Sequence, residues 1–162
     1  MQKIPLAILN LQEDGYHILV DVQLFGQPFK MVVDTGASKT VLDKTTLLHS
    51  GISEDKFQDT HILSTGLGTN SMQSFILEIP EFRIGDWHTR HFLTAVLDLS
   101  SINYAYAQMN LDPVIGVLGG DILRTYGAQI DYKKLVLTLR SRPLKFEQPP
   151  VDVQPQIDIE TD

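Results

Sequence analysis

The stretch Phe29-Lys-Met-Val-Val-Asp-Thr-Gly-Ala-Ser38 decides the fold. Its apolar run, Met31 to Val33, favours a buried β-strand and ends abruptly at Asp34-Thr35-Gly36. A carboxylate at the end of a buried strand is costly unless hydrogen bonds or chemistry compensate for its burial. The threonine can supply a hydroxyl that fixes a neighbouring backbone, and the glycine allows a turn or a close approach that a Cβ would block. The stretch therefore predicts a strand that delivers a held carboxylate to a turn.

The length and charge of the chain favour one globular domain. Its 162 residues are 43% hydrophobic and 20% charged, which is ordinary for a domain large enough to bury a core. The net charge is −7, but five acids and no Lys or Arg lie from Glu147 to the end. The remaining body is nearly balanced and has no basic stripe to meet phosphates. This distribution argues against nucleic acid as a partner.

Composition also excludes several kinds of functional site and indicates the cellular compartment. The chain has no cysteine, which excludes disulfides, thiol nucleophiles and zinc–cysteine sites. No apolar run approaches the ~20 residues that a membrane helix requires, so no membrane partner is expected. The first ten residues predict a strand and not a signal peptide, because no small-residue cleavage site follows them. A cytoplasmic setting is the expectation.

The first third of the chain predicts short strands joined by turns. Residues Ile4–Leu11 predict one strand, and Tyr16–Phe25 alternates between apolar even-numbered and mostly polar odd-numbered positions, as a half-buried strand does. A turn at 26–28 leads back into 29–33, which makes a hairpin. Asp43 is placed to cap a short helix through His49. This pattern favours a closed or folded sheet over a Rossmann unit.

A hairpin with a glycine-rich tip follows. Thr60–Thr65 and Met72–Ile79 predict its two strands, and Gly66-Leu67-Gly68 lies at its tip. Such a tip holds few buried contacts and can move over a cleft to exclude water and clamp a substrate. A surface hairpin without a role is the alternative. A phosphate loop is not supported, since the last glycine of that fingerprint and a following helix are missing.

The second half of the chain contains a motif similar to the first stretch. Val117-Leu118-Gly119 again runs from two apolar residues into a glycine and predicts a short helix through Leu123. Before it we expect a hairpin turning at Gly85-Asp86, an apolar strand at 92–97 and an irregular loop with one helical turn at 100–113. After it, residues 128–139 predict a closing hairpin.

Taken together, these motifs resemble the retropepsin-like aspartic proteases, the single-lobe relatives of pepsin that include the retroviral proteases. The resemblance rests on Asp34-Thr35-Gly36-Ala37, the glycine-tipped hairpin and Val117-Leu118-Gly119, in this order and spacing, and covers roughly residues 14–140. It implies an all-β, closed barrel-like fold with one or two short helices and a flap hairpin, over residues 1–142. Residues 143–162 form an acidic, proline-rich tail that we expect to be extended or disordered, with an alternation that could pair with a sheet edge.

The resemblance also implies a role for each matching position. Asp34 would be the catalytic aspartate, Thr35 would cross-link the two active-site loops, and Gly36 would let the loop pass close to the substrate. Substrate contacts would come from Ala37, Gly66, Leu67, Gly68, Val117 and Leu118. Retroviral members carry Arg-Asn where this chain has Gly120-Asp121, so the resemblance does not extend to the viral dimer contacts.

The chain contains a single Asp-Thr-Gly and no second copy of the motif. The chemistry needs two carboxylates about 3 Å apart that share one proton. One chain cannot supply that pair, but two chains related by a two-fold axis can. The sequence therefore predicts a homodimer in which two Asp34 side chains meet, acting on a peptide or protein substrate, with an acidic optimum that belongs to the pair.

Other interpretations remain or are disfavoured. The same fold could serve as a peptide-binding or dimerisation module without turnover. His88 and His91 have a spacing that suits a metal on a helix, but no third ligand is apparent, and we expect neither metal nor cofactor. Ser38 and Thr40 have no His or Asp at a motif spacing that would make either a nucleophile.

Overall fold

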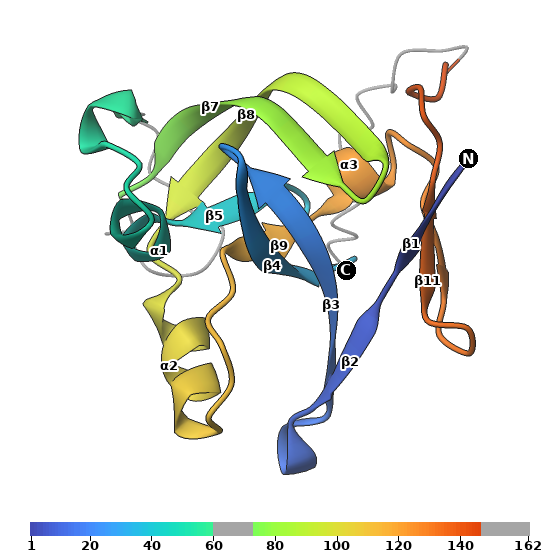
Figure 1. The fold of residues 1–162 in the computed structure, drawn as a ribbon, viewed down its shortest axis with the longest axis horizontal. Coiled ribbons are helices and arrows are strands. Elements are labelled where there is room, and N and C mark those ends of the chain that lie inside the picture. The colour runs from blue at the N-terminus through green and yellow to red at the C-terminus, as the bar shows by residue number, and fades with distance from the viewer. Residues whose placement is uncertain (60–72, 147–162) are drawn as a thin grey trace, which may run out of the picture.

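The structure, a computed structural model, describes residues 1–59 and 73–146 (Figure 1). The strands are β1 (Gln2–Pro5), β2 (Ala7–Asn10), β3 (Tyr16–Leu24), β4 (Gln27–Val33), β5 (Val41–Asp43), β6 (Gln58–Asp59), β7 (Phe75–Ile84), β8 (Trp87–Leu97), β9 (Gly116–Leu118), β10 (Gln129–Asp131) and β11 (Val136–Leu139). The α-helices are α1 (Lys44–His49), α2 (Ser100–Gln108) and α3 (Gly120–Leu123). None of the helices in this part of the chain is long and apolar enough to span a membrane.

Six strands close into a barrel. The larger sheet runs in the order β2-β3-β4-β9-β5-β8-β7-β6. An additional pairing of β3 with β7 closes six of these strands into a ring of β3, β4, β9, β5, β8 and β7 and leaves β2 and β6 outside it. The long β7–β8 hairpin arches across the barrel in Figure 1. Its interior holds the larger apolar core, which includes Trp87 and Phe82 in an edge-to-face contact at 5.9 Å between ring centroids. The mostly-β, barrel-like fold expected from the sequence is confirmed.

The β3–β4 hairpin follows the predicted alternation. In β3 the even-numbered residues from Ile18 to Leu24 point into the barrel, and Val20 lies opposite Met31 of β4. The odd-numbered face is polar and exposed at Asp21 and Gln23, as expected. Leu19 is the exception, because it is buried on that outer face under α2.

The prediction of one strand over residues 4–11 was wrong, because this stretch forms two strands. Residues 4–11 divide at Leu6 into β1 and β2, which join different sheets. The backbone N–H of Leu6 donates to the carbonyl of Leu135 at 2.9 Å, which directs β1 toward β11. Pro5, which ends β1, was the available signal for this change of partner, because proline inside an apolar run interrupts a strand. The three-stranded sheet β1-β11-β10 that results contains the predicted closing hairpin.

Two local predictions are confirmed, and a third predicted too short a helix. The β7–β8 hairpin turns at Gly85-Asp86, and Gly85 adopts a positive φ of 58°. Asp43 caps α1, since its side chain accepts a hydrogen bond from the Thr46 N–H at 3.1 Å. The region expected to be a loop with one helical turn contains the nine-residue helix α2.

Parts of two predicted segments lie outside the described residues. The strand at 60–65 and the glycine tip at 66–68 are among them, as is the tail from residue 147 onward. The described start of the tail packs back on the domain: the Leu144 N–H donates to the Thr125 carbonyl at 2.8 Å, and the Arg124 guanidinium lies 4.0 Å from the Phe146 ring centroid.

Candidate active site

Asp34 stands at the end of β4, on a tight turn that exposes its side chain. Its Oδ1 accepts a hydrogen bond from the Gly36 N–H at 2.9 Å, and its carbonyl accepts one from the Ala37 N–H at 3.2 Å. Its own N–H donates to the Leu118 carbonyl at 3.0 Å. The carboxylate is therefore fixed by its own turn while remaining open to solvent, as a group that must meet a ligand should be.

The strand that holds Asp34 pairs with the strand of the echoing motif. β4 and β9 run parallel, with Val32 opposite Val117 and Val33 opposite Leu118. The two similar sequence motifs thus lie side by side and end at the same edge. Directly after β9, the backbone passes so close to the Asp34 loop that a Cβ on Gly119 would lie 2.5 Å from the Lys39 carbonyl carbon and oxygen. Only glycine fits there without moving the Asp34 loop.

A polar network joins the end of that loop to α3. The Thr40 hydroxyl donates to Asp121 Oδ1 at 2.7 Å and accepts from the Gly119 N–H at 3.1 Å, while the Thr40 N–H donates to the same Asp121 oxygen at 2.9 Å. The Gly120 N–H donates to the Ala37 carbonyl at 2.7 Å. Because Thr40 is buried and these bonds connect the Asp34 loop to a segment about 80 positions away, the network rigidifies the loop.

Sequence reasoning missed Thr40 and Asp121 as parts of this support. Thr40 was considered only as a nucleophile, and Asp121 only as a departure from the retroviral Arg-Asn. Their distance of 81 positions in the chain hides the pairing. The available signal was Asp121 in the first turn of a short helix that follows an apolar-apolar-Gly motif.

The structure gathers most of the predicted site residues around this loop. Thr35 and Gly36 are exposed, whereas Ala37 and Val117 are half-buried. Within the described ranges the Thr35 hydroxyl has no hydrogen-bond partner. Leu118 is fully buried in the barrel core and contributes its carbonyl instead of its side chain. Gly66, Leu67 and Gly68 lie outside the described residues.

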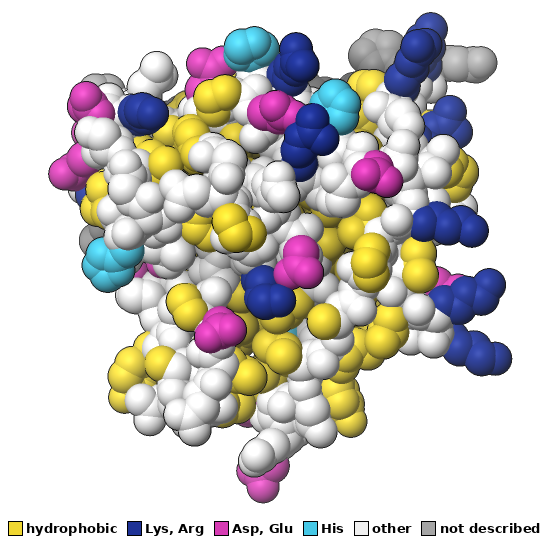
Figure 2. Space-filling view, in the orientation of Figure 1, with side chains coloured by type: hydrophobic (Ala, Val, Ile, Leu, Met, Phe, Trp, Pro, Cys, Tyr) yellow, Lys and Arg dark blue, Asp and Glu magenta, His cyan; other side chains and the backbone are white. Residues whose placement is uncertain are grey.

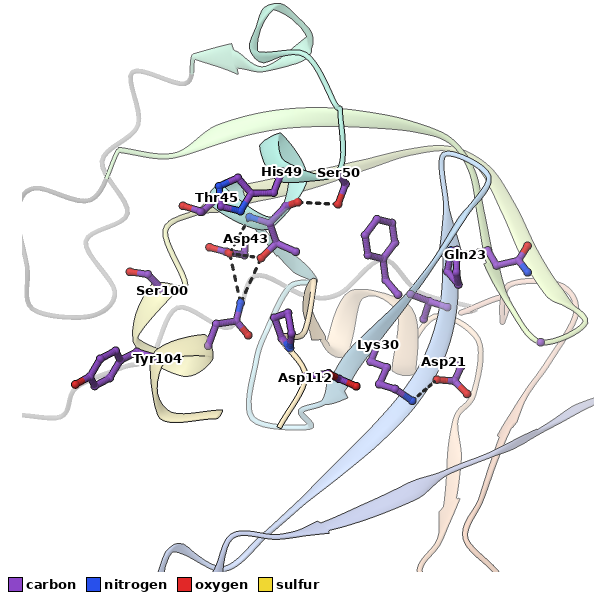
Figure 3. A pocket seen from close by; sticks show the side chains of 17 residues that line it. Asp21, Gln23, Lys30, Asp43, Thr45, His49, Ser50, Ser100, Tyr104 and Asp112 are labelled. Atoms are coloured by element: carbon purple, nitrogen blue, oxygen red, sulfur yellow. Dashed lines mark hydrogen bonds and ion pairs between the residues drawn. The ribbon is translucent and has the colours of Figure 1, made fainter. Parts of the chain in front are cut away.

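A separate hollow of about 1070 Å³ lies between α1, α2 and the β3–β4 hairpin (Figure 3). Asp43 and Asn103 join at its wall, and a Lys30–Asp21 ion pair at 3.0 Å lies at its rim. Asp34 is not among its lining residues. The hollow is therefore distinct from the candidate active site, whose carboxylate faces open solvent in a single chain.

The described residues contain no cluster of three His, Cys, Asp or Glu side chains that could hold a metal ion. His88 and His91 lie on β8 and not on a helix, and His91 Nδ1 instead lies 3.0 Å from Glu78 Oε1. The helical geometry that their spacing requires for a metal is not formed.

Comparisons with known proteins agree with this geometry. A search of the curated proteins returned no match. Among solved structures, a retropepsin-like aspartic protease from Rickettsia conorii is similar with a TM-score of 0.56 and 23% identity, over 88% of this chain and 97% of that one. The retroviral protease-like domain of Ddi1 from Leishmania major is similar with a TM-score of 0.53 and 18% identity, over 83% and 96%. At these identities the likeness establishes the fold.

The family follows from the sequence match. Residues 20–122 match the family described as aspartyl protease, and this range contains β4, the Asp34 turn, β9 and the Gly119 crossing that supports the turn. With a closed β-barrel and a held, exposed aspartate at the paired ends of β4 and β9, the chain belongs to the retropepsin-like aspartyl proteases.

Proposed function

We propose that the protein is an aspartic endopeptidase whose active unit is a homodimer. The observation that carries this proposal is Asp34 itself, a carboxylate that is held by its own turn and yet exposed on a chain of the aspartyl protease family. A structural carboxylate would be satisfied within its own chain, as Asp43 is. The exposure of Asp34 leaves room for its counterpart from a second chain.

In the proposed dimer, two Asp34 carboxyl groups share one proton across the two-fold axis. The ionised carboxylate takes a proton from a water molecule, whose oxygen attacks the carbonyl carbon of the peptide bond, while the protonated carboxyl donates to the carbonyl oxygen. Transfer of a proton to the amide nitrogen and cleavage of the C–N bond then release an acid and an amine. The Thr35 hydroxyl, which bonds to none of the described residues of its own chain, is available to bond the partner's loop.

The substrate in this proposal is an extended peptide. The candidate binding residues Ala37 and Val117 flank Asp34 with half-buried surfaces, and backbone groups at a strand end suit pairing with an added strand. The roles assigned to Gly66, Leu67 and Gly68 as the flap tip remain predictions within the same proposal.

A peptide-library experiment tests the activity. Wild type and Asp34→Asn are incubated with mixed peptides between pH 4 and pH 7, and products are identified by mass spectrometry. We expect internal cleavage by wild type and its loss in Asp34→Asn, with unchanged circular dichroism. Cleavage that persists in the folded variant would exclude Asp34 as the catalytic group. Peptide binding without cleavage at any of these pH values would favour the non-catalytic binding module.

A further inference from the structure

A second apolar cluster lies outside the barrel, on the face that carries Asp34. Met31 and Val33 of β4 belong to the barrel core, whereas Val32 belongs to the outer cluster, and Asp34 follows Val32 by two positions, directly after the strand. Val117 and Leu19 lie opposite Val32 on the two neighbouring strands and belong to the same cluster. Two residues along a strand span about 7 Å. The cluster is therefore adjacent to the candidate catalytic carboxylate.

Tyr106 of α2 closes this cluster from the outside. Its side chain is 1% exposed among Leu19, Val32 and the other members, and its hydroxyl lies 2.7 Å from His17 Nδ1. Burial raises the pKa of the Tyr106 hydroxyl above its ordinary value. Figure 2 shows hydrophobic side chains gathered over the region between α2 and the β2–β3 hairpin.

Helix α2 is held firmly in this position. The Leu99 N–H donates to Asp43 Oδ1 at 2.8 Å, just before the helix begins. Asn103 makes two hydrogen bonds to Val114, one to its carbonyl at 3.0 Å and one from its N–H at 2.8 Å. Val114 precedes β9 by two positions, so these bonds connect the helix to the strand that pairs with β4. The Tyr106 ring is thus a fixed wall and not a mobile surface group.

We propose that Tyr106 is a specificity-determining residue that limits the depth of the side-chain subsite beside Asp34. This inference rests on the proposed function. An extended peptide rises about 3.3 Å per residue, so a side chain next to a bond held at Asp34 reaches the half-buried surface of Val117. Val117 packs against the cluster that contains Val32 and the buried Tyr106 ring, so these side chains limit the space beside it. The subsite accepts aliphatic side chains of about the size of valine and excludes aromatic ones.

The test compares hydrolysis of two peptides that differ only in valine or phenylalanine next to the cleaved bond. Tyr106→Ala should raise the ratio of kcat/KM for phenylalanine over valine by about tenfold or more, because pocket volume discriminates on this scale. Tyr106→Phe retains the ring and should keep the wild-type ratio. Tyr104→Ala is the matched control, since Tyr104 lies on the same helix with 69% exposure and should also keep the ratio.

The folded state of each variant is checked by thermal melting. If Tyr106→Ala does not fold, Tyr106→Leu preserves apolar packing with a smaller side chain and should shift the ratio in the same direction. An unchanged ratio in folded Tyr106→Ala or Tyr106→Leu, or an equal shift in Tyr104→Ala, would overturn the subsite assignment while Asp34-dependent cleavage stands. A wild type that cleaves no peptide would instead overturn the proposed function and this inference together.

Discussion

At the scale of single residues, the packing that supports the Asp34 loop requires a glycine, without a side chain, at position 119. Gly119 lies where the chain after β9 passes the Asp34 loop, and a Cβ there would lie 2.9 Å from the Ala37 carbonyl oxygen as well as 2.5 Å from Lys39. These contacts are with backbone atoms, which cannot move aside as a flexible side chain can. The closest neighbours of a Cβ on Gly120 would instead lie at an ordinary 3.4 Å.

Gly119→Ala is therefore expected to destabilise the protein and displace the catalytic loop. Overpacking of this kind typically costs about 1–3 kcal/mol of unfolding free energy. A displacement of Asp34 by about 1 Å is expected to lower kcat/KM about 100-fold. Urea unfolding and peptide hydrolysis measure the two effects, with Gly120→Ala as the control that should change each far less. Equal behaviour of the two alanine variants would contradict the close-approach argument.

At the scale of elements, Asp43 connects α1, which directly follows it, to the start of α2, 56 positions away in the chain. It caps α1 through the Thr46 N–H, receives the Leu99 N–H ahead of α2, and is 2% exposed. Asp98 also stands before α2, where its Oδ1 accepts from the Ser100 N–H at 2.9 Å, but its side chain is exposed. The two acids thus make similar bonds in very different surroundings.

We expect Asp43→Ala to lower the unfolding free energy by about 2–4 kcal/mol, since it removes a cap and leaves the N–H groups of the half-buried Thr46 and Leu99 unpaired. Asp98→Ala should have a much smaller effect. The side-chain and backbone hydrogen bonds from Ser100 hold the pKa of Asp98 below its usual range. Because the folded-state pKa is lowered, the stability that Asp98 contributes is present above its unfolded-state pKa and is lost as pH falls through the folded-state pKa.

Chemical unfolding of wild type and both variants, at neutral and at acidic pH, measures these differences. The gap between wild type and Asp98→Ala should close as the pH falls, whereas a gap that widened in acid would contradict the assigned direction. An effect of Asp43→Ala no larger than that of Asp98→Ala would show that α1 and α2 do not depend on the buried acid.

The sequence was informative for elements with a local signal. The alternation of β3, the Gly85-Asp86 turn and the Asp43 cap each depend on neighbouring residues, and each was predicted correctly. Helix α2 was predicted too short because its residues are polar and aromatic without a strong apolar stripe. Its position depends on the contacts of Asn103 with Val114 and of Tyr106 with His17 of the distant strand β3. The division between β1 and β2 depends on pairing with β11, at the other end of the chain.

The candidate site could be predicted in part for the same reason. The Asp34 motif identifies the carboxylate, and the β4–β9 pairing confirms that its echo lies beside it. The Thr40–Asp121 bonds and the Gly119 crossing exist only after the chain has folded, since they join residues about 80 positions apart. No local pattern specifies such contacts.

At the scale of the whole molecule, one chain is a closed barrel that supplies one aspartate of the proposed catalytic pair. The barrel closes on itself through β3 and β7, and its core is formed by residues of a single chain. The barrel is closed by strands of one chain, whereas the proposed chemistry takes a carboxylate from each of two chains. Because Asp34 is exposed and lies outside the core, Asp34→Asn is expected to fold and can be mixed with wild type.

Mixing wild type with Asp34→Asn tests the central claim most directly. The two are unfolded together, refolded at a fixed total concentration that supports dimers, and assayed for peptide hydrolysis as the wild-type fraction is varied. Random pairing makes activity follow the square of that fraction, so an equal mixture should retain about a quarter of full activity, compared with about half for independent monomers. A quadratic dependence is the result that we predict, and a linear one would contradict a catalytic pair built from two chains.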